Sequence, residues 1–482
     1  MILGIDCGTT GTTAVLLNLK GKVLGRKTVS VRQYFPQAAW VEHSPPQIWK
    51  TVGEAVTGAL RAAKISPKKI QCIGLTNQRE TVSLFDGETP LHPFIVWQDR
   101  RTAAYCESLK KYEDKIIDIA GTPVDPYFSA SKIRWLLKKL SIQSPSSRLR
   151  FRTVDSFVVF KMTGRDCIEA TNASRVSLMD LKRIRWSEDL FDLYEIPRSL
   201  APTIIPSQNL ELKTRGLSFL PDGIPISGIL GDQQAALFGQ SGWNPGAGKI
   251  TFGTGSFILL NTGKTCVRSK NRLVSTLALQ WRSGEARYAL EGSAFICGAW
   301  IQWLRDELGL IKKSAEIAAL ARSAKTSDGV MVIPALSGLG APFWKSHARG
   351  AILGLTRGSS KAQIARASLE ALAFQNRALI DAMKKDAKIS KEDWRVDGGA
   401  ASNNLLMQIQ ADVLGKNIIR PKNLEATATG AAFLAAEASG LLSLKEIQQT
   451  WKPDRRFEPR SDVSTLENLY QAWHTKVLQS HP

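Results

Sequence analysis

The stretch Gly231-Asp232-Gln233-Gln234-Ala235-Ala236-Leu237-Phe238-Gly239 decides the fold that we expect for this chain. The apolar run at 224–230 predicts a strand before it, and 235–238 predict the start of a packed helix. Asp232 therefore lies where a strand turns into a helix, near the middle of 482 residues. Such a junction offers free backbone N–H groups and the positive end of a helix dipole, which suits phosphate chemistry. Taken alone, the pattern favours a plainer interpretation, in which Asp232 is only a helix N-cap.

A strand, a Gly/Thr turn and a second strand occur twice in the chain. The first turn is Cys7-Gly8-Thr9-Thr10-Gly11 and the second is Gly253-Thr254-Gly255, and both following strands end in Leu-Leu-Asn. The repetition predicts two copies of one domain plan, at 1–241 and 242–482. A turn rich in backbone donors can wrap a phosphate, with Asp6 facing a bound Mg²⁺. Each turn by itself is equally compatible with a plain hairpin.

Three further stretches bear on the chemistry. A predicted strand at 70–76 leads into Asn77-Gln78-Arg79-Glu80, in which Arg79 and Glu80 either form a surface ion pair or hold polar substrate hydroxyls. Val396-Asp397-Gly398-Gly399-Ala400 links a predicted strand to a helix, and glycine there lets a nucleotide approach the backbone. Gly246-Ala247-Gly248-Lys249 resembles part of a P-loop but lacks the first Gly at the right spacing and a Ser or Thr after the Lys, so we reject it.

Composition limits the class of protein. With 43% hydrophobic and 22% charged residues the chain is ordinary globular material, and it holds no apolar run long enough for a membrane span. Six scattered cysteines without a C-x-x-C pair, and the lack of a signal peptide, predict a cytoplasmic protein without structural zinc. The net charge of +21 is spread along the chain, which favours a solvated surface over a nucleic-acid site.

Together, the repeated domains, the glycine-rich turns and the mid-chain Asp resemble the actin-like ATPase superfamily, and within it the FGGY carbohydrate kinases that act on glycerol. The resemblance runs nearly end to end, and its runs are rare by chance: Thr76-Asn77-Gln78-Arg79-Glu80, Val96-Trp97-Gln98-Asp99-Arg100-Arg101, Asp125-Pro126-Tyr127-Phe128-Ser129 and Asp397-Gly398-Gly399-Ala400. It implies an α/β fold of two duplicated RNase H-like domains with an interdomain cleft. Glycerol and the catalytic base would belong to residues 1–241, and the nucleotide to residues 242–482.

The resemblance implies a transferase, an ATP-dependent kinase that phosphorylates glycerol to sn-glycerol 3-phosphate. Asp232 matches the general base of the family. An unperturbed Asp, with a pKa of ~3.9, is a weak base at pH 7, which a loose phosphoryl-transfer transition state tolerates. The positions matched to glycerol are Arg79, Glu80, Trp97, Tyr127, Asp232, Gln233 and Phe257. The positions matched to the nucleotide are Thr9, Thr10, Gly11, Thr254, Gly298, Gln302, Gly399 and Asn403, and those matched to Mg²⁺ are Asp6 and Asp232.

Two residues depart from the family pattern. Thr13 stands where these kinases usually carry an Arg near the nucleotide phosphates. The absence of that positive charge is expected to weaken ATP binding or alter catalysis. Trp300 replaces a small residue beside Gly298, which is expected to narrow the nucleotide pocket. The alternatives are a kinase for another polyol or sugar, or a non-catalytic actin-like nucleotide-binding protein. We expect glycerol and ATP as partners, no nucleic acid, no stable membrane insertion, and a homo-oligomer, either a dimer or a tetramer.

Overall fold

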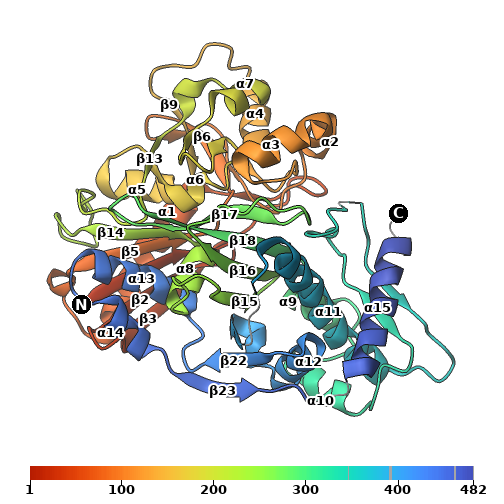
Figure 1. Ribbon diagram of the computed structural model, residues 1–482. Coiled ribbons are helices and arrows are strands. Elements are labelled where there is room, and N and C mark those ends of the chain that lie inside the picture. Colours follow the sequence, from red (N-terminus) through yellow and green to blue (C-terminus); the bar gives the residue numbers. More distant parts are fainter. Residues whose placement is uncertain (346, 390–392, 461–462, 481–482) are drawn as a thin grey trace.

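Two β-sheets with the same central topology form the cores of the two halves of the chain (Figure 1). The computed structural model describes residues 1–345, 347–389, 393–460 and 463–480. The first sheet has the order β14-β5-β1-β2-β3, in which β1, β2 and β3 are antiparallel neighbours and β5 and β14 run parallel to β1. Its strands are β1 (Ile2–Cys7), β2 (Gly11–Leu17), β3 (Val23–Ser30), β5 (Cys72–Asn77) and β14 (Ile226–Gly231).

The second sheet repeats this plan and extends it at both edges. Its order is β17-β18-β16-β15-β21-β22-β23, and the central series β18-β16-β15-β21-β22 matches β3-β2-β1-β5-β14 strand for strand in direction. The duplication predicted from the two Gly/Thr turns is therefore present in the topology. The strands are β15 (Gly248–Phe252), β16 (Ser256–Gly263), β17 (Val274–Gln280), β18 (Ala286–Ala294), β21 (Asp393–Asp397), β22 (Asn417–Pro421) and β23 (Pro453–Phe457).

Two helices pack at the junction between the sheets. Helix α8 (Asp232–Gly239) follows β14, and the Ala-rich helix α13 (Ala426–Ala438) packs against α8 and across β1, β5 and β14. The contact is backbone to backbone, because a Cβ at Gly74 in β5 would lie 2.1 Å from the carbonyl oxygen of Ala431. Small residues on both sides thus let a helix from late in the chain close the first sheet.

The remaining helices cover the outer faces. Helix α1 (Pro45–Ala63) packs on β2 and β3 and is capped by Ser44, whose hydroxyl accepts the N–H of Gln47. In the second half, the sheet and its neighbours are covered by α9 (Gly298–Asp306), α11 (Lys361–Ala387), α12 (Asn404–Leu414) and α15 (Val463–Ser480). The capping box of α11, made by Ser360 and Gln363, fixes its start.

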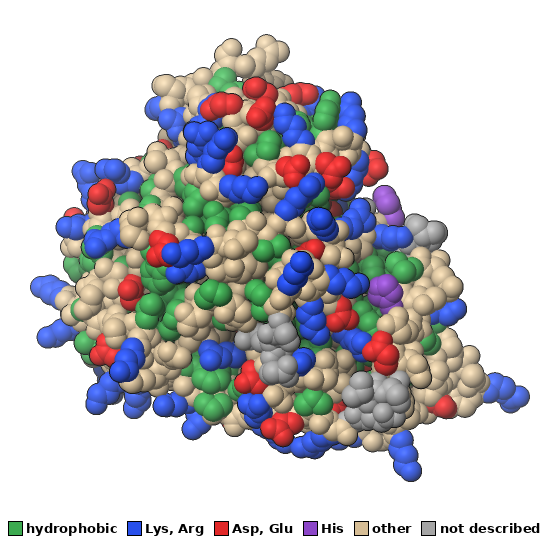
Figure 2. Space-filling view, viewed as in Figure 1, with side chains coloured by type: hydrophobic (Ala, Val, Ile, Leu, Met, Phe, Trp, Pro, Cys, Tyr) green, Lys and Arg blue, Asp and Glu red, His purple; other side chains and the backbone are tan. Residues whose placement is uncertain are grey.

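A smaller antiparallel sheet and several helices form a further layer beyond the first sheet, at the top of Figure 1. It contains β4 (Glu42–His43), β6 (Val82–Asp86), β7 (Thr89–Pro90), β8 (Phe94–Ile95) and β9 (Leu149–Thr153), with α3 (Glu113–Ala120) and α4 (Ser129–Lys139) beside them. Within the described residues, no helix has both the length and the apolarity that crossing a membrane requires. Lys and Arg side chains are scattered among acidic and apolar ones on the face in Figure 2.

Candidate active site

Asp232 lies at the carboxyl end of the first sheet, beside Arg79. Strands β14 and β5 are parallel neighbours, with Gly231 opposite Asn77, so the residues that follow them emerge side by side. Gly231 is the N-cap of α8, and the Asp232 carboxylate accepts the N–H of Gln233 at 2.7 Å instead of capping the helix. Its oxygen lies 3.1 Å from Arg79 Nε, and 28% of the side chain is exposed. The plainer interpretation of Asp232 as a helix N-cap is therefore wrong.

The residues matched to glycerol surround one cavity of about 200 Å³. All seven line this cavity. The first Gly/Thr turn reaches it through Thr9 and Thr10, and the second turn reaches it through Thr254. A second cavity of about 620 Å³ is lined by Gly298, Gln302, Gly399 and Asn403, the remaining nucleotide positions except Gly11. Gly253 and Thr254 border both cavities, so the two are adjacent. Gly11, at the start of β2, is outside both linings.

Three aromatic rings form the apolar wall of the smaller cavity. The ring of Trp97 meets those of Tyr127 and Phe257 edge to face, with centroids 5.7 and 6.0 Å apart. Trp97 Nε1 also donates a hydrogen bond of 2.9 Å to Thr9 Oγ1, which ties this wall to the first Gly/Thr turn. Phe257 comes from β16, so the second half of the chain contributes to the same cavity. The wall offers the C–H faces of a small polyol an apolar surface.

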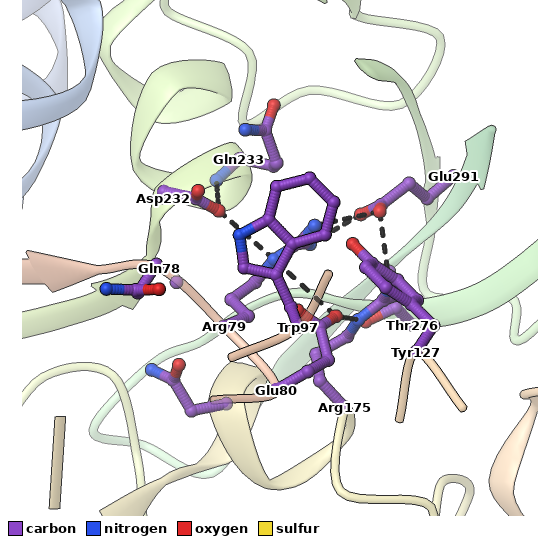
Figure 3. Close-up of polar contacts among 12 residues, drawn as sticks. Gln78, Arg79, Glu80, Trp97, Tyr127, Arg175, Asp232, Gln233, Thr276 and Glu291 are labelled. Carbon is purple, nitrogen blue, oxygen red and sulfur yellow. Dashed lines mark hydrogen bonds and ion pairs between the residues drawn. The ribbon is translucent and has the colours of Figure 1, made fainter. Parts of the chain in front are cut away.

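A buried network of charges lies behind the cavity (Figure 3). Arg79 makes a bidentate pair with Glu291, at 2.5 and 2.8 Å, and Arg175 donates to Glu80 at 2.5 Å and to Glu291 at 3.2 Å. Arg79 and Glu80 are each only 2% exposed, so the alternative of a surface ion pair is excluded. Burial alone would raise the pKa of Glu291, but Arg175 and Arg79 hold it at about 2. Burial raises the pKa of Glu80 despite both arginines.

The carboxylates of Asp6 and Asp232 lie close enough for their charges to interact. Burial raises the pKa of Asp6 well above its usual range, and the charge of Asp232 raises it further. Its Oδ1 is buried without a hydrogen-bond partner. Burial also raises the pKa of Asp232, against the opposing pull of Arg79 and Lys249. Asp232 is therefore a stronger base than the unperturbed Asp assumed from the sequence.

Lys249, rejected as a P-loop lysine, has a different place in the site. It lies fully buried in β15, and its ammonium donates to the side chains of Gln233 and Thr251. Thr251 in turn donates to Asp397 at 2.5 Å. Burial lowers the pKa of Lys249 to about 8 even though Asp397 and Asp232 oppose the change. This chain of contacts joins α8 to β15 and β21 across the two halves of the molecule.

Four residues of the charged network, Arg175, Lys249, Glu291 and Asp397, are not among the site residues predicted from the sequence. A detectable signal existed for Lys249 and Glu291, because each is a charged residue inside a strand that is otherwise largely apolar. Ionised side chains in such positions are almost always paired when buried, which marks them as part of a network. The partners themselves are distant in sequence, since Arg79 and Glu291 are separated by 212 positions.

The two residues that depart from the family pattern, Thr13 and Trp300, lie in different surroundings. Thr13 Oγ1 shares a hydrogen bond of 2.9 Å with Thr28 Oγ1 between β2 and β3. Trp300 is 1% exposed, donates from Nε1 to Ser368 Oγ at 2.9 Å, and is not among the residues that line the larger cavity. The expectation that Trp300 narrows the nucleotide pocket is therefore wrong. Its ring instead packs into the core between α9 and α11.

Comparisons with known proteins cover nearly the whole chain. The N-terminal domain profile of the FGGY family of carbohydrate kinases matches residues 1–239, and the C-terminal domain profile matches residues 248–439. Glycerol kinase from Bdellovibrio bacteriovorus is 48% identical over 482 aligned residues, which cover 98% of this chain and 97% of that protein. Glycerol kinase from Listeria innocua is 44% identical, covering 99% and 98%. A crystal structure of Plasmodium falciparum glycerol kinase with ADP matches with a TM-score of 0.90 at 30% identity, covering 99% and 98%.

Proposed function

The chain belongs to the FGGY family of carbohydrate kinases, and we propose that it transfers the γ-phosphoryl group of ATP to a terminal hydroxyl of glycerol, giving sn-glycerol 3-phosphate and ADP. The observation that carries this proposal is the cavity of about 200 Å³ in which Asp232, Arg79, Glu80 and the aromatic wall meet, directly beside the larger cavity. Its small size and its mixture of donors, acceptors and ring faces suit a three-carbon triol.

On the acceptor side, Asp232 takes the proton of the attacking hydroxyl as the oxygen approaches the γ-phosphate. Its raised pKa makes this transfer more favourable than for a solvated Asp. Arg79 donates to a glycerol oxygen and Glu80 accepts from a hydroxyl, while Trp97 and Phe257 cover the carbon chain. Because the transition state is loose, correct alignment of these groups contributes most of the catalysis.

On the donor side, the nucleotide occupies the larger cavity with its phosphates directed toward Thr254. The backbone N–H groups of the Gly/Thr turns at Thr9, Thr10 and Thr254 donate to phosphate oxygens there. Asn403 already uses its Oδ1 to cap α12, accepting from Leu405 and Leu406, so its amide nitrogen is the group left for the nucleotide.

The residues present also fit Mg²⁺. Asp6 has a buried carboxylate oxygen without a partner, and Asp232 lies close enough to raise its pKa, an arrangement that a cation would relieve. The described residues hold no cluster of three or more acidic, His or Cys ligands, but Mg²⁺ in kinases commonly needs only one or two carboxylates besides the phosphates. When bound with ATP, the ion would neutralise phosphate charge between these two residues.

The proposal also includes the domain that binds each substrate, the cellular compartment and the oligomeric state. We assign glycerol and the base to residues 1–241 and the nucleotide to residues 242–482. The six cysteines are all free thiols, which suits a reducing cytoplasm. A dimer or tetramer remains our expectation, and sedimentation of the purified chain would test it.

The proposed function is tested by measuring ADP release from MgATP with glycerol, xylulose, gluconate, erythritol or no acceptor. Strong stimulation by glycerol alone is the expected result. Stimulation by a different polyol would keep the reaction class but overturn the assignment of Arg79 and Glu80 to glycerol. Binding of ATP without stimulation by any acceptor would support the non-catalytic alternative.

A further inference from the structure

Glu291 contacts Arg79, a residue of the acceptor site, through both carboxylate oxygens, although it does not line the cavity itself. It lies in the middle of β18, in the second sheet, and is 0% exposed. Both of its carboxylate oxygens accept from Arg79, which follows β5 in the first sheet. A carboxylate from one half of the molecule therefore fixes a substrate-facing arginine of the other half.

The donors of Arg79 show what this pairing achieves. A guanidinium carries five N–H donors in a rigid plane. One Nη1 donor bonds Glu291 and one bonds Gln234 at 3.1 Å, while one of the two Nη2 donors bonds the other oxygen of Glu291, so the second Nη2 donor and Nε are left. Nε is buried without an aligned hydrogen bond, and it faces Asp232 at 3.1 Å. Glu291 thus holds the plane so that the Nε edge remains for Asp232 and an oxygen bound beside it.

The same carboxylate holds a second arginine. Arg175 Nη2 donates to Glu291 at 3.2 Å, and its Nε donates to Glu80 at 2.5 Å. The Arg175 guanidinium also lies over the ring of Tyr127, with its central carbon 5.5 Å from the centroid. Through Arg175, Glu291 acts on the orientation of Glu80 and Tyr127, two residues that line the cavity. Figure 3 shows these side chains converging from both halves of the chain.

Charge balance makes this arrangement sensitive to Glu291. Behind the cavity, two guanidiniums are matched by the carboxylates of Glu80 and Glu291, with Asp232 as a further negative group at the cavity itself. Without the charge of Glu291, two buried arginines would share Glu80 and Asp232. Arg79 would then be drawn toward the base and Arg175 toward Glu80, because a buried charge does not remain unpaired.

We propose that Glu291 is a positioning residue for phosphoryl transfer, which orients Arg79 directly and Glu80 through Arg175 so that both can engage glycerol. This inference rests on the proposed function. It does not require Glu291 to touch either substrate. It assigns to β18 of the second domain a share in acceptor recognition.

The test compares Glu291→Gln, which keeps the shape and removes the charge, with the wild type in steady-state kinetics. We expect the KM for glycerol to rise and kcat to fall, each by between about tenfold and about a hundredfold, while the KM for ATP stays within about twofold. Glu285→Gln, an exposed carboxylate just before the same strand, is the matched control and should leave all three parameters unchanged.

A charge-compensated variant separates positioning from a general structural role. Arg175→Met combined with Glu291→Gln removes one charge of each sign, so the double variant should lose far less activity than the product of the two single losses. Glu291→Asp keeps the charge but shortens the side chain, and it should lower activity even if Glu291→Gln fails to fold.

Wild-type kinetics in Glu291→Gln, multiplicative losses in the double variant, or full activity in Glu291→Asp would each overturn the inference. A wild type without glycerol-dependent ADP release would overturn the proposed function and the inference with it. An active wild type with an unaffected Glu291→Gln variant would overturn the inference alone.

Discussion

Replacing Asp232 with Asn is expected to lower turnover by roughly 10²- to 10⁴-fold without harming the fold. The amide keeps the size of the side chain but cannot accept the hydroxyl proton. It also loses the charge that faces Arg79 Nε at 3.1 Å. The two effects are separable, because Arg79 keeps its bidentate pair with Glu291 in the variant. The guanidinium should therefore stay in place, and the loss should fall mainly on the chemical step.

The magnitude follows from the role of the base. Positioned proton transfer contributes roughly 10²- to 10⁴-fold, or about 3–5 kcal/mol of transition-state stabilisation. Stability should move the other way. The folded state raises the pKa of Asp232, mainly through burial, so at pH 7 its ionised form is disfavoured by folding. Removing that charge also relieves Asp6, whose pKa it raises. The unfolding midpoint of Asp232→Asn should therefore equal or exceed that of the wild type.

The assay is ADP release with saturating glycerol and MgATP, alongside thermal unfolding of the same preparations. Asp189→Asn is the control, because Asp189 is an exposed carboxylate paired with Lys115 at 3.2 Å on the surface of α7 (Glu188–Leu193). Activity of Asp232→Asn within tenfold of the wild type would refute the role of the base. A lowered unfolding midpoint would refute the argument that burying the ionised Asp232 carboxylate destabilises the folded state.

Three further outcomes are expected. Because folding lowers the pKa of Lys249 from 10.5 to about 8, the unfolded chain binds more protons between these values, so wild-type stability should gain from rising pH there. Lys249→Met should lack that gain in denaturant titrations at pH 7.5 and 10, and identical pH dependence would contradict the burial of the ammonium. Gly398→Ala should destabilise the chain and raise the KM for ATP, because φ is 86° and the new Cβ would lie 2.5 Å from the carbonyl oxygen of Phe252. Gly284→Ala, also at positive φ but with open space around it, should cost only the backbone strain, and equal effects would exclude the steric argument. Glycerol with a non-hydrolysable ATP analogue should reduce the radius of gyration in solution scattering, as the two halves close to exclude water, and superimposable profiles would contradict closure.

The local parts of this structure could be predicted because each leaves a periodic or turn-forming signal. The two Gly/Thr turns identify the duplicated hairpins, and the apolar strand before Asp232 identifies β14 and the helix that follows it. Ser44 marks the start of α1 in the same way. These features depend on neighbours within a few residues, where chain geometry alone restricts the possible conformations.

The long-range parts could not be predicted from such signals. The Ala-rich pattern at 425–439 predicts a helix, but nothing in it indicates that this helix returns to cover the first sheet. The identity of the partner of Arg79 depends on the register of β18, which lies 212 positions away. The pKa of Asp232 likewise depends on burial by both halves of the chain, so the unperturbed value was the only one that the sequence could supply.

The distribution of the network also limits how far the two domains can be treated as separate modules. Residues 1–241 carry Arg79 and Arg175, but the carboxylate that pairs with both comes from β18. Detached from the second half, these arginines would face Glu80 and Asp232 alone, and the aromatic wall would lack Phe257. In the proposed function, acceptor recognition therefore belongs to the junction of the two sheets. It follows that exchanging residues 1–241 between family members would carry over acceptor specificity only if Glu291 and its register in β18 were retained.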